Sequence, residues 1–194
     1  MRRVLALVTT FTLWLAIPAE AGGPNQVVNA SPTADGVAVH RSAVQVVSTG
    51  TSSVDSQNVA AALPTGCTGC EGVAVAFQAL ILTGRPSVIR PLNAAVAANT
   101  SCTSCKAFAF AYQLVVTADH GTHLSALGRA KVRDIRRRAA ALVDAGLPFD
   151  QLDAQLSALR DEFRAAVISD LDHAGADPRD ATPDLDVDEA PIGS

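Results

Sequence analysis

Four cysteines are the residues of this chain best suited to chemistry, and they occur as two Cys-x-x-Cys motifs. The first motif occupies positions 67–70 (Cys-Thr-Gly-Cys), and the second, at 102–105 (Cys-Thr-Ser-Cys), follows it by 35 positions (102 − 67). Paired thiols at this spacing can form disulfides, bind a metal ion as thiolates, or carry out thiol–disulfide exchange. The surrounding segments must position them, and these segments indicate which chemistry is favoured.

Structural disulfides are the favoured interpretation for Cys67, Cys70, Cys102 and Cys105. The number of cysteines is even, and the export signal described below predicts an oxidising compartment. Pairing within a motif closes a four-residue loop and stabilises by about 2 kcal/mol, whereas a bridge between the motifs closes a longer loop and contributes about 4 kcal/mol. Loop entropy favours the bridge, but local contact favours pairing within each motif, which is the pairing we expect.

Zinc is the alternative cofactor, because the same four cysteines could supply a tetrahedral thiolate site. The spacer between Cys70 and Cys102 has 31 intervening residues (101 − 70), longer than the roughly 15 to 20 that are usual for a zinc ribbon. A thiol-redox site is the third alternative, but such sites usually lie at a helix N-terminus, and here a strand-like run follows each motif. We therefore predict no cofactor, with zinc as the alternative.

The two motifs lie in matching surroundings. Asn58 and Asn93 begin the short apolar run before each motif, and Gln78 and Gln113 lie in the alternating run after it. A period of two, with one bulky and one mostly small face, is typical of a β-strand that is covered on both sides. The units at about 58–84 and 93–119 are therefore predicted to be hairpins with their cysteines in the turn. We expect Gln78 and Gln113 to hydrogen-bond across the sheet.

The spacing of apolar residues changes to three and four after His123, and this predicts two amphipathic helices separated by Gly146-Leu147-Pro148. Asp150 is the predicted N-cap of the second helix. The predicted fold class is α+β: a small antiparallel β-sheet of repeated hairpins over residues 37–118, followed by an antiparallel helical hairpin over 123–173. Residues 174–194 are acidic and rich in proline, and they are predicted to be a disordered tail.

The N-terminus resembles an export signal. Arg2 and Arg3 precede an apolar stretch, and Ala19-Glu20-Ala21 is a small-x-small cleavage pattern, so residues 1–21 are predicted to be a signal peptide. Residues 22–36 are rich in Gly, Pro and Asn and are predicted to be a flexible lead-in. We expect a secreted or extracytoplasmic protein with no stable membrane span after cleavage.

The remaining residues offer little other chemistry. With 15 basic against 19 acidic residues, the chain has no basic excess for a nucleic-acid partner. His120 and His123 could share one side of a helix, but a polar hinge that caps the helix is the favoured interpretation. The arginines between Arg133 and Arg138 are expected to form a solvated face, since Asp134 can pair with Arg138. Neither a His-Glu-x-x-His helix nor a Gly-x-Ser-x-Gly motif occurs, so no enzyme activity is predicted.

The order of these features resembles a family of secreted bacterial Cys-x-x-Cys repeat proteins that are often labelled peptide zinc metalloproteases. The resemblance covers about residues 37–172, from the first alternating run to the second helix. The label implies a protease function, but the His-Glu-x-x-His helix that a zinc protease needs does not occur here. Association with a separate membrane protease is an alternative origin of the label. We therefore expect an exported non-enzymatic protein, stabilised by disulfides, that acts through an unknown protein or cell-envelope partner. The alternative is a metal-binding accessory protein with a four-cysteine site, or a thiol-redox accessory protein.

Overall fold

The computed structural model describes residues 24–118, 123–173 and 179–180. In chain order its elements are β1 (Gln26–Ala30), β2 (Ala38–Thr49), β3 (Ser53–Ala62), β4 (Glu71–Thr83), β5 (Val88–Ala97), β6 (Lys106–Ala118), α1 (Ala126–Val143), α2 (Phe149–His173) and β7 (Arg179–Asp180). Strands β1, β3 and β5 form one parallel sheet, called sheet A. Strands β2, β4 and β6 form a second parallel sheet, called sheet B, and β7 pairs antiparallel with β6 at its edge.

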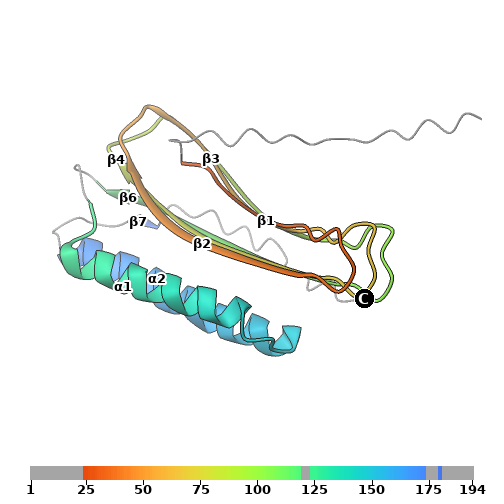
Figure 1. The fold of residues 1–194 in the computed structure, drawn as a ribbon. Helices are drawn as coiled ribbons and strands as arrows, with labels where there is room; N and C mark the ends of the chain where they lie inside the picture. The colour runs from red at the N-terminus through yellow and green to blue at the C-terminus, as the bar shows by residue number, and fades with distance from the viewer. Residues whose placement is uncertain (1–23, 119–122, 174–178, 181–194) are drawn as a thin grey trace, which may run out of the picture.

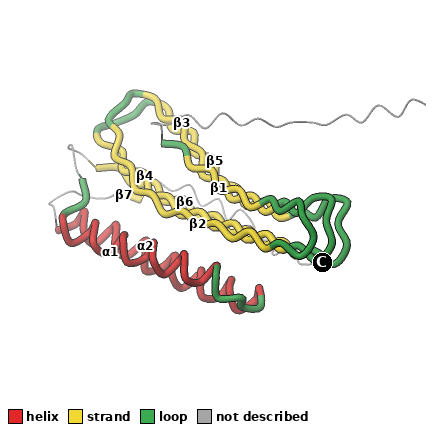
Figure 2. The backbone as a smooth tube through the Cα atoms, in the orientation of Figure 1, coloured by secondary structure: helices red, strands yellow, loops and turns green. Residues whose placement is uncertain are grey.

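The predicted antiparallel sheet of hairpins is wrong. Strands β3 and β4, which flank the first Cys-x-x-Cys turn, belong to different sheets, and so do β5 and β6 around the second turn. Each strand instead pairs in parallel with the equivalent strand of the next unit, so that Glu71 lies opposite Lys106 and Asn58 lies opposite Asn93. The chain thus winds as a β-solenoid of three coils, namely β1–β2, β3–β4 and β5–β6, which Figures 1 and 2 show stacked side by side.

The physical reason for the error is that a period of two reports only which faces of a strand are covered. It contains no information on which strand supplies the hydrogen-bond partner or in which direction that strand runs. The segment 22–36, predicted to be a flexible lead-in, also differs, because it contains β1, which pairs with the second half of β3 from Gln26 opposite Asn58 to Ala30 opposite Ala62. A five-residue strand among glycine and proline residues gives little periodic signal.

Part of the space between the two sheets is filled by small side chains and by amides, and a separate buried cluster of Val54, Leu80, Leu82 and Val115 fills the rest. The cluster of small side chains is made of alanines and one valine: Val28, Ala30, Ala60, Ala62, Ala74, Ala76, Ala107 and Ala111. Beside it, Gln26, Asn58 and Asn93 lie in register on sheet A, and each amide bonds to the next: Gln26 Nε2 to Asn58 Oδ1 at 3.1 Å and Asn58 Nδ2 to Asn93 Oδ1 at 2.8 Å. Side chains this small let the two sheets approach closely, and the amides satisfy one another.

The outer face of sheet B carries the large side chains, and the helices cover it (Figure 1). Phe77 on β4 is fully buried, and its ring centroid lies 5.9 Å from that of Phe163 on α2. Val73, Val75 and Ile81 belong to the same cluster. The molecule therefore has three layers: sheet A, sheet B and the helical pair.

The two helices begin and end close to the predicted positions and pack against each other. Ser125 is the N-cap of α1, and its hydroxyl accepts from the N–H of Gly128 at 3.1 Å. Gly146 follows α1 with a φ of 63°, a left-handed conformation that favours glycine. Asp150, predicted to be the N-cap of α2, lies instead in its first turn, because the helix begins at Phe149.

Several predictions fall on residues that the structure does not describe: the signal peptide at 1–21, most of the acidic tail at 174–194, and His120. Across the described ranges, no helix has the length and apolar character that crossing a membrane requires.

Candidate functional site

The two Cys-x-x-Cys turns lie beside each other at one end of the solenoid. Thr65 pairs with Thr100 and Thr68 with Thr103 in parallel bridges. Backbone hydrogen bonds run between the turns before and after the cysteines, from Gly66 N–H to Thr100 O at 3.0 Å and from Lys106 N–H to Cys70 O at 2.8 Å. The stacked backbones therefore hold equivalent cysteines of the two motifs, which are 35 residues apart in the sequence, in register.

Each turn needs two residues with positive φ, one before the first cysteine and one before the second. In the first turn these residues are Gly66 and Gly69, both with a φ of 66°. In the second turn they are Ser101 and Ser104, with φ values of 51° and 55°. Glycine adopts this conformation without steric cost, whereas for serine it is sterically unfavourable. The second turn therefore has the same backbone conformation as the first, although its serines disfavour it.

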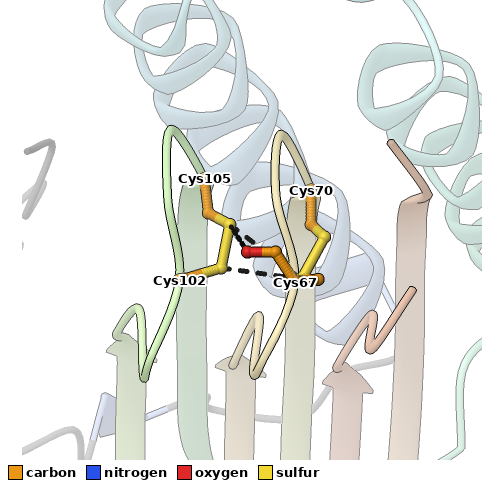
Figure 3. Close-up of side chains that lie close together, drawn as sticks. All are labelled: Cys67, Cys70, Cys102 and Cys105. Atoms are coloured by element: carbon orange, nitrogen blue, oxygen red, sulfur yellow. Dashed lines mark hydrogen bonds between the residues drawn. A yellow bond between two sulfur atoms is a disulfide. The ribbon is translucent and has the colours of Figure 1, made fainter. Parts of the chain in front are cut away.

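All four sulfur atoms lie in one cluster, within 4.8 Å of one another (Figure 3). The sulfurs of Cys67 and Cys70 are joined as one disulfide, and those of Cys102 and Cys105 as a second. Between the turns, Cys67 Sγ lies 3.5 Å from Cys102 Sγ and 3.9 Å from Cys105 Sγ. Cys67, Cys70 and Cys105 are buried, so the cluster is largely closed to solvent.

The distances between the turns also fit a metal site. Four thiolates at about 2.3 Å from a tetrahedral zinc ion have sulfur atoms about 3.8 Å apart, and the separations from Cys67 to the second turn bracket that value. The donor set, four cysteines from two knuckles, is one that zinc accepts. As placed, the sulfurs form two disulfides. To hold a zinc ion, both disulfides would have to be reduced and the two sulfurs of each motif would have to move apart, whereas the separations between the turns already suit the ion.

The immediate surroundings of the sulfurs are electron-rich. Cys70 Sγ lies 3.1 Å from the carbonyl oxygen of Ala34, and Cys105 Sγ lies 3.4 Å from that of Cys67. Within the described part of the chain, no N–H group donates a hydrogen bond to any of the four sulfurs. A thiolate is stabilised by N–H donors and nearby cations, and carbonyl oxygens supply the opposite charge. The electrostatics here favour uncharged sulfur.

The predicted hydrogen bond between Gln78 and Gln113 is present, and these amides form a second buried ladder. Gln113 Nε2 donates to Gln78 Oε1 at 2.6 Å. Ser56 Oγ also donates to Gln78 Oε1 at 2.9 Å, and Gln78 Nε2 donates to the carbonyl oxygen of Pro24 at 2.8 Å. Because no buried side-chain nitrogen or oxygen among the described residues lacks a hydrogen-bond partner, the ladder is a structural element rather than a reactive one.

The histidines do not form a metal site with one another in the described residues. The imidazole of His40 lies 3.2 Å from Glu71 and 3.4 Å from Asp144, at the edge of sheet B near the end of α1. His123 instead lines a cavity between β2 and the first half of α1. Among the described residues the four cysteines are the only group with three or more potential metal ligands close together.

The cavity beside α1 was not anticipated from the sequence. Its volume is about 530 Å³, and its lining residues are Val46, Ser48, His123, Leu124, Arg129, Val132, Arg133 and Arg136. The helical spacing of the three arginines, at i, i+4 and i+7, was visible in the sequence as a charged face. The sequence did not show that β2 lies opposite this face and closes a cavity over it.

Comparisons of this chain with family models, with curated proteins and with solved structures found no match.

Proposed function

We propose that this chain is an exported, non-enzymatic protein whose cysteines form two disulfides and whose solenoid acts through contacts with a protein or cell-envelope partner. The observation that carries the proposal is the environment of the sulfur cluster: Cys67, Cys70 and Cys105 are buried, and their sulfurs face carbonyl oxygens rather than N–H donors. Burial without compensating donors disfavours charged thiolates, and the uncharged alternative with all four sulfurs satisfied is a pair of disulfides.

The outer face of sheet A supports a role in binding. Parallel sheets are normally covered on both faces, and sheet B is covered by the helices. On sheet A, alternation along the strands places Val27, Leu92 and Val96 on the face opposite the interior, with exposed fractions of 43%, 49% and 45%. Apolar residues grouped on an exposed sheet face are typical of a contact surface.

The redox part of the proposal is tested by the intact mass and the thiol count of the protein purified from an oxidising compartment. Two disulfides predict a mass lower by four hydrogen atoms and no thiol that reacts with an alkylating reagent under denaturing conditions. Four alkylated cysteines in protein free of metal would contradict it.

The contact part is tested by co-purification from the native envelope with a double variant, Leu92→Gln/Val96→Gln, which removes apolar surface from sheet A. The matched control is Leu127→Gln, at a position on α1 that is 65% exposed. We expect the double variant, but not the control, to lose a specific co-purifying partner. Equal recovery of that partner with all three proteins would contradict a role for sheet A.

The second candidate is an accessory protein that works beside a membrane peptidase and uses its four cysteines for metal binding or thiol redox chemistry. It is favoured by one observation, the separations of 3.5 Å and 3.9 Å from Cys67 Sγ to the sulfurs of the second turn. In the metal-bound state Cys67, Cys70, Cys102 and Cys105 would hold the ion. Native mass spectrometry of the reduced protein with added zinc distinguishes the candidates, because a mass increment of one zinc ion that a chelator removes would support the second.

A further inference from the structure

The cavity between β2 and α1 has a chemical character that the proposed function does not explain. One wall is the outer face of β2, where Val46 lies, and the other is the first half of α1 with the segment before it. Leu124 and Val132 give this wall a buried apolar part. The volume of about 530 Å³ lies within the range of roughly 300–1,000 Å³ that is usual for small-molecule sites.

The polar residues that line the cavity in the described part of the chain are cationic or neutral. Arg129, Arg133 and Arg136 all line it, together with His123, and none of the described lining residues is a carboxylate. The three arginines fall at i, i+4 and i+7 of α1, which places them along one side of the helix. Three guanidinium groups thus converge on one space beside apolar side chains.

These three arginines differ from their neighbours on the same helix in having no acidic partner among the described residues. Arg137 pairs with Asp134 at 2.8 Å, and Arg138 pairs with Asp134 and with Glu162. In the described part of the chain no carboxylate lies within ion-pair distance of Arg129, Arg133 or Arg136. The predicted pairing with acidic residues is therefore found for Arg137 and Arg138 but not for the arginines that line the cavity.

Two of the three guanidiniums are held in place by backbone carbonyl groups. Arg136 donates to the carbonyl oxygen of Val44 from Nε at 3.2 Å and from Nη2 at 2.6 Å, and Arg129 donates to that of Leu124. A carbonyl fixes a guanidinium without neutralising its charge. The positive charge is therefore oriented in advance, which lowers the entropic cost of binding an anion.

We propose that this cavity binds a small organic anion made of a phosphate or carboxylate group on a short alkyl chain. Guanidinium groups bind phosphate and carboxylate oxygens through paired, charge-assisted hydrogen bonds. Val46, Leu124 and Val132 provide the apolar surface on which the chain packs. This inference is independent of the cysteines, so a failure here leaves the disulfide count unchanged, and the reverse is also true.

Isothermal titration calorimetry of the full chain with n-octyl phosphate, kept below its critical micelle concentration, tests the proposal. Inorganic phosphate and octyl glucoside are the comparison ligands, since the first has the anionic group without the alkyl chain and the second has the alkyl chain without the anionic group. We expect one binding site for octyl phosphate and at least tenfold weaker binding of both comparison ligands. Equal affinity for inorganic phosphate, or no octyl phosphate binding, would overturn the proposal.

The variant Arg133→Gln locates the site, and Arg137→Gln is its matched control with the same change in charge. Arg133 has no described acidic partner, so its loss should leave the fold intact. Arg137 lies outside the cavity and is 73% exposed. We expect octyl phosphate to bind about tenfold more weakly to Arg133→Gln, because one charge-assisted contact is lost. Its affinity for Arg137→Gln should equal its affinity for the wild type.

A competition experiment with vesicles distinguishes a free ligand from a membrane lipid that carries the same anionic and alkyl groups. Vesicles of phosphatidylglycerol should not compete with octyl phosphate for the protein, because a cavity of about 530 Å³ has room for a short alkyl chain, and the acyl chains of a vesicle lipid stay in the bilayer. Equal weakening by both arginine variants, or binding to vesicles without binding to octyl phosphate, would show a general charge effect and overturn the assignment of the cavity.

Discussion

Gln113 Nε2 donates a hydrogen bond to Gln78 Oε1 at 2.6 Å, and the two residues lie directly opposite each other on neighbouring parallel strands. This contact links the second and third coils of the solenoid inside the space between the sheets. Gln78 is fully buried, and Ser56 of sheet A donates to the same oxygen. One amide oxygen thus connects two coils and both sheets.

Replacing Gln78 with leucine should destabilise the protein by about 1–3 kcal/mol, because Ser56 and Gln113 would lose their shared buried acceptor. Urea unfolding followed by circular dichroism measures the change. The control is Gln57→Leu, the same substitution at an exposed position on β3, which should stay within about 0.5 kcal/mol of the wild type. Similar midpoints for the two variants would contradict the role of the ladder.

Replacing Gly128 with alanine should destabilise the protein, although alanine is the better helix former by about 1 kcal/mol. A Cβ atom at this position would collide with the carboxylate of Asp170 on α2, which accepts from the Ser125 N–H at 2.7 Å and from the Ser125 hydroxyl. Thermal unfolding measures the change. In an Asp170→Ala background the collision is gone, and Gly128→Ala should then be neutral or stabilising.

The free energy of unfolding should fall at acidic pH, in part because the Asp170 carboxylate becomes protonated. Burial raises the pKa of this carboxyl group, but hydrogen bonds from Ser125 and Gly128 and the charge of Lys131 outweigh burial and lower it overall. A folded-state pKa below the unfolded value of about 3.9 means that the contribution is fully present above that value and is lost as pH falls through the folded-state pKa.

The measurement for this prediction is the urea midpoint of the wild type and of Asp170→Asn between about pH 6 and pH 3. The gap between the two proteins should narrow as the pH falls. Asp161→Asn is the control, since the Asp161 side chain is 71% exposed. The difference in urea midpoint between this variant and the wild type should change little with pH. A gap for Asp170→Asn that is constant with pH would refute the role of this carboxylate.

Removing the Cys67–Cys70 disulfide by a double alanine substitution should cost about 2 kcal/mol by loop entropy alone, and more through packing, because both side chains lie between neighbouring turns and are 4% and 1% exposed. The matched variant lacks Cys102 and Cys105, which form the outer turn of the stack. We expect the inner pair to cost more than the outer pair in chemical unfolding under oxidising conditions. The reverse order would contradict the stacked arrangement.

Replacing Pro91 with valine should promote self-association. The Ala98 N–H donates to Ala62 on β3, so by alternation the backbone groups of Pro91 face the edge of β5 that pairs with no described strand. Proline offers no N–H there, and such residues protect edge strands from pairing with another chain. Sedimentation velocity at increasing concentration measures the effect, and Arg90→Val, on the outer sheet face, is the control. Monomers at all concentrations for Pro91→Val would contradict this role.

The strands, the two helices and the turns that carry the cysteines were predictable from the sequence, because each has a local signal. Alternation around Phe77 and Phe110 indicated strands that are covered on both faces, and spacings of three and four after His123 indicated the helices. The short strand β1 was missed, because five residues among prolines and glycines are too few to show a period.

The sequence by itself determined the elements and the matching of Asn58 with Asn93 and of Cys67 with Cys102. Only the tertiary structure decided that these matched residues lie side by side in parallel strands, rather than at opposite ends of separate hairpins. It also placed β2 opposite Arg133 and Arg136 and so made a cavity from a charged helix face. The physical reason is that side-chain periodicity records which faces of an element are buried, whereas hydrogen bonds and packing between distant segments determine which neighbour buries them.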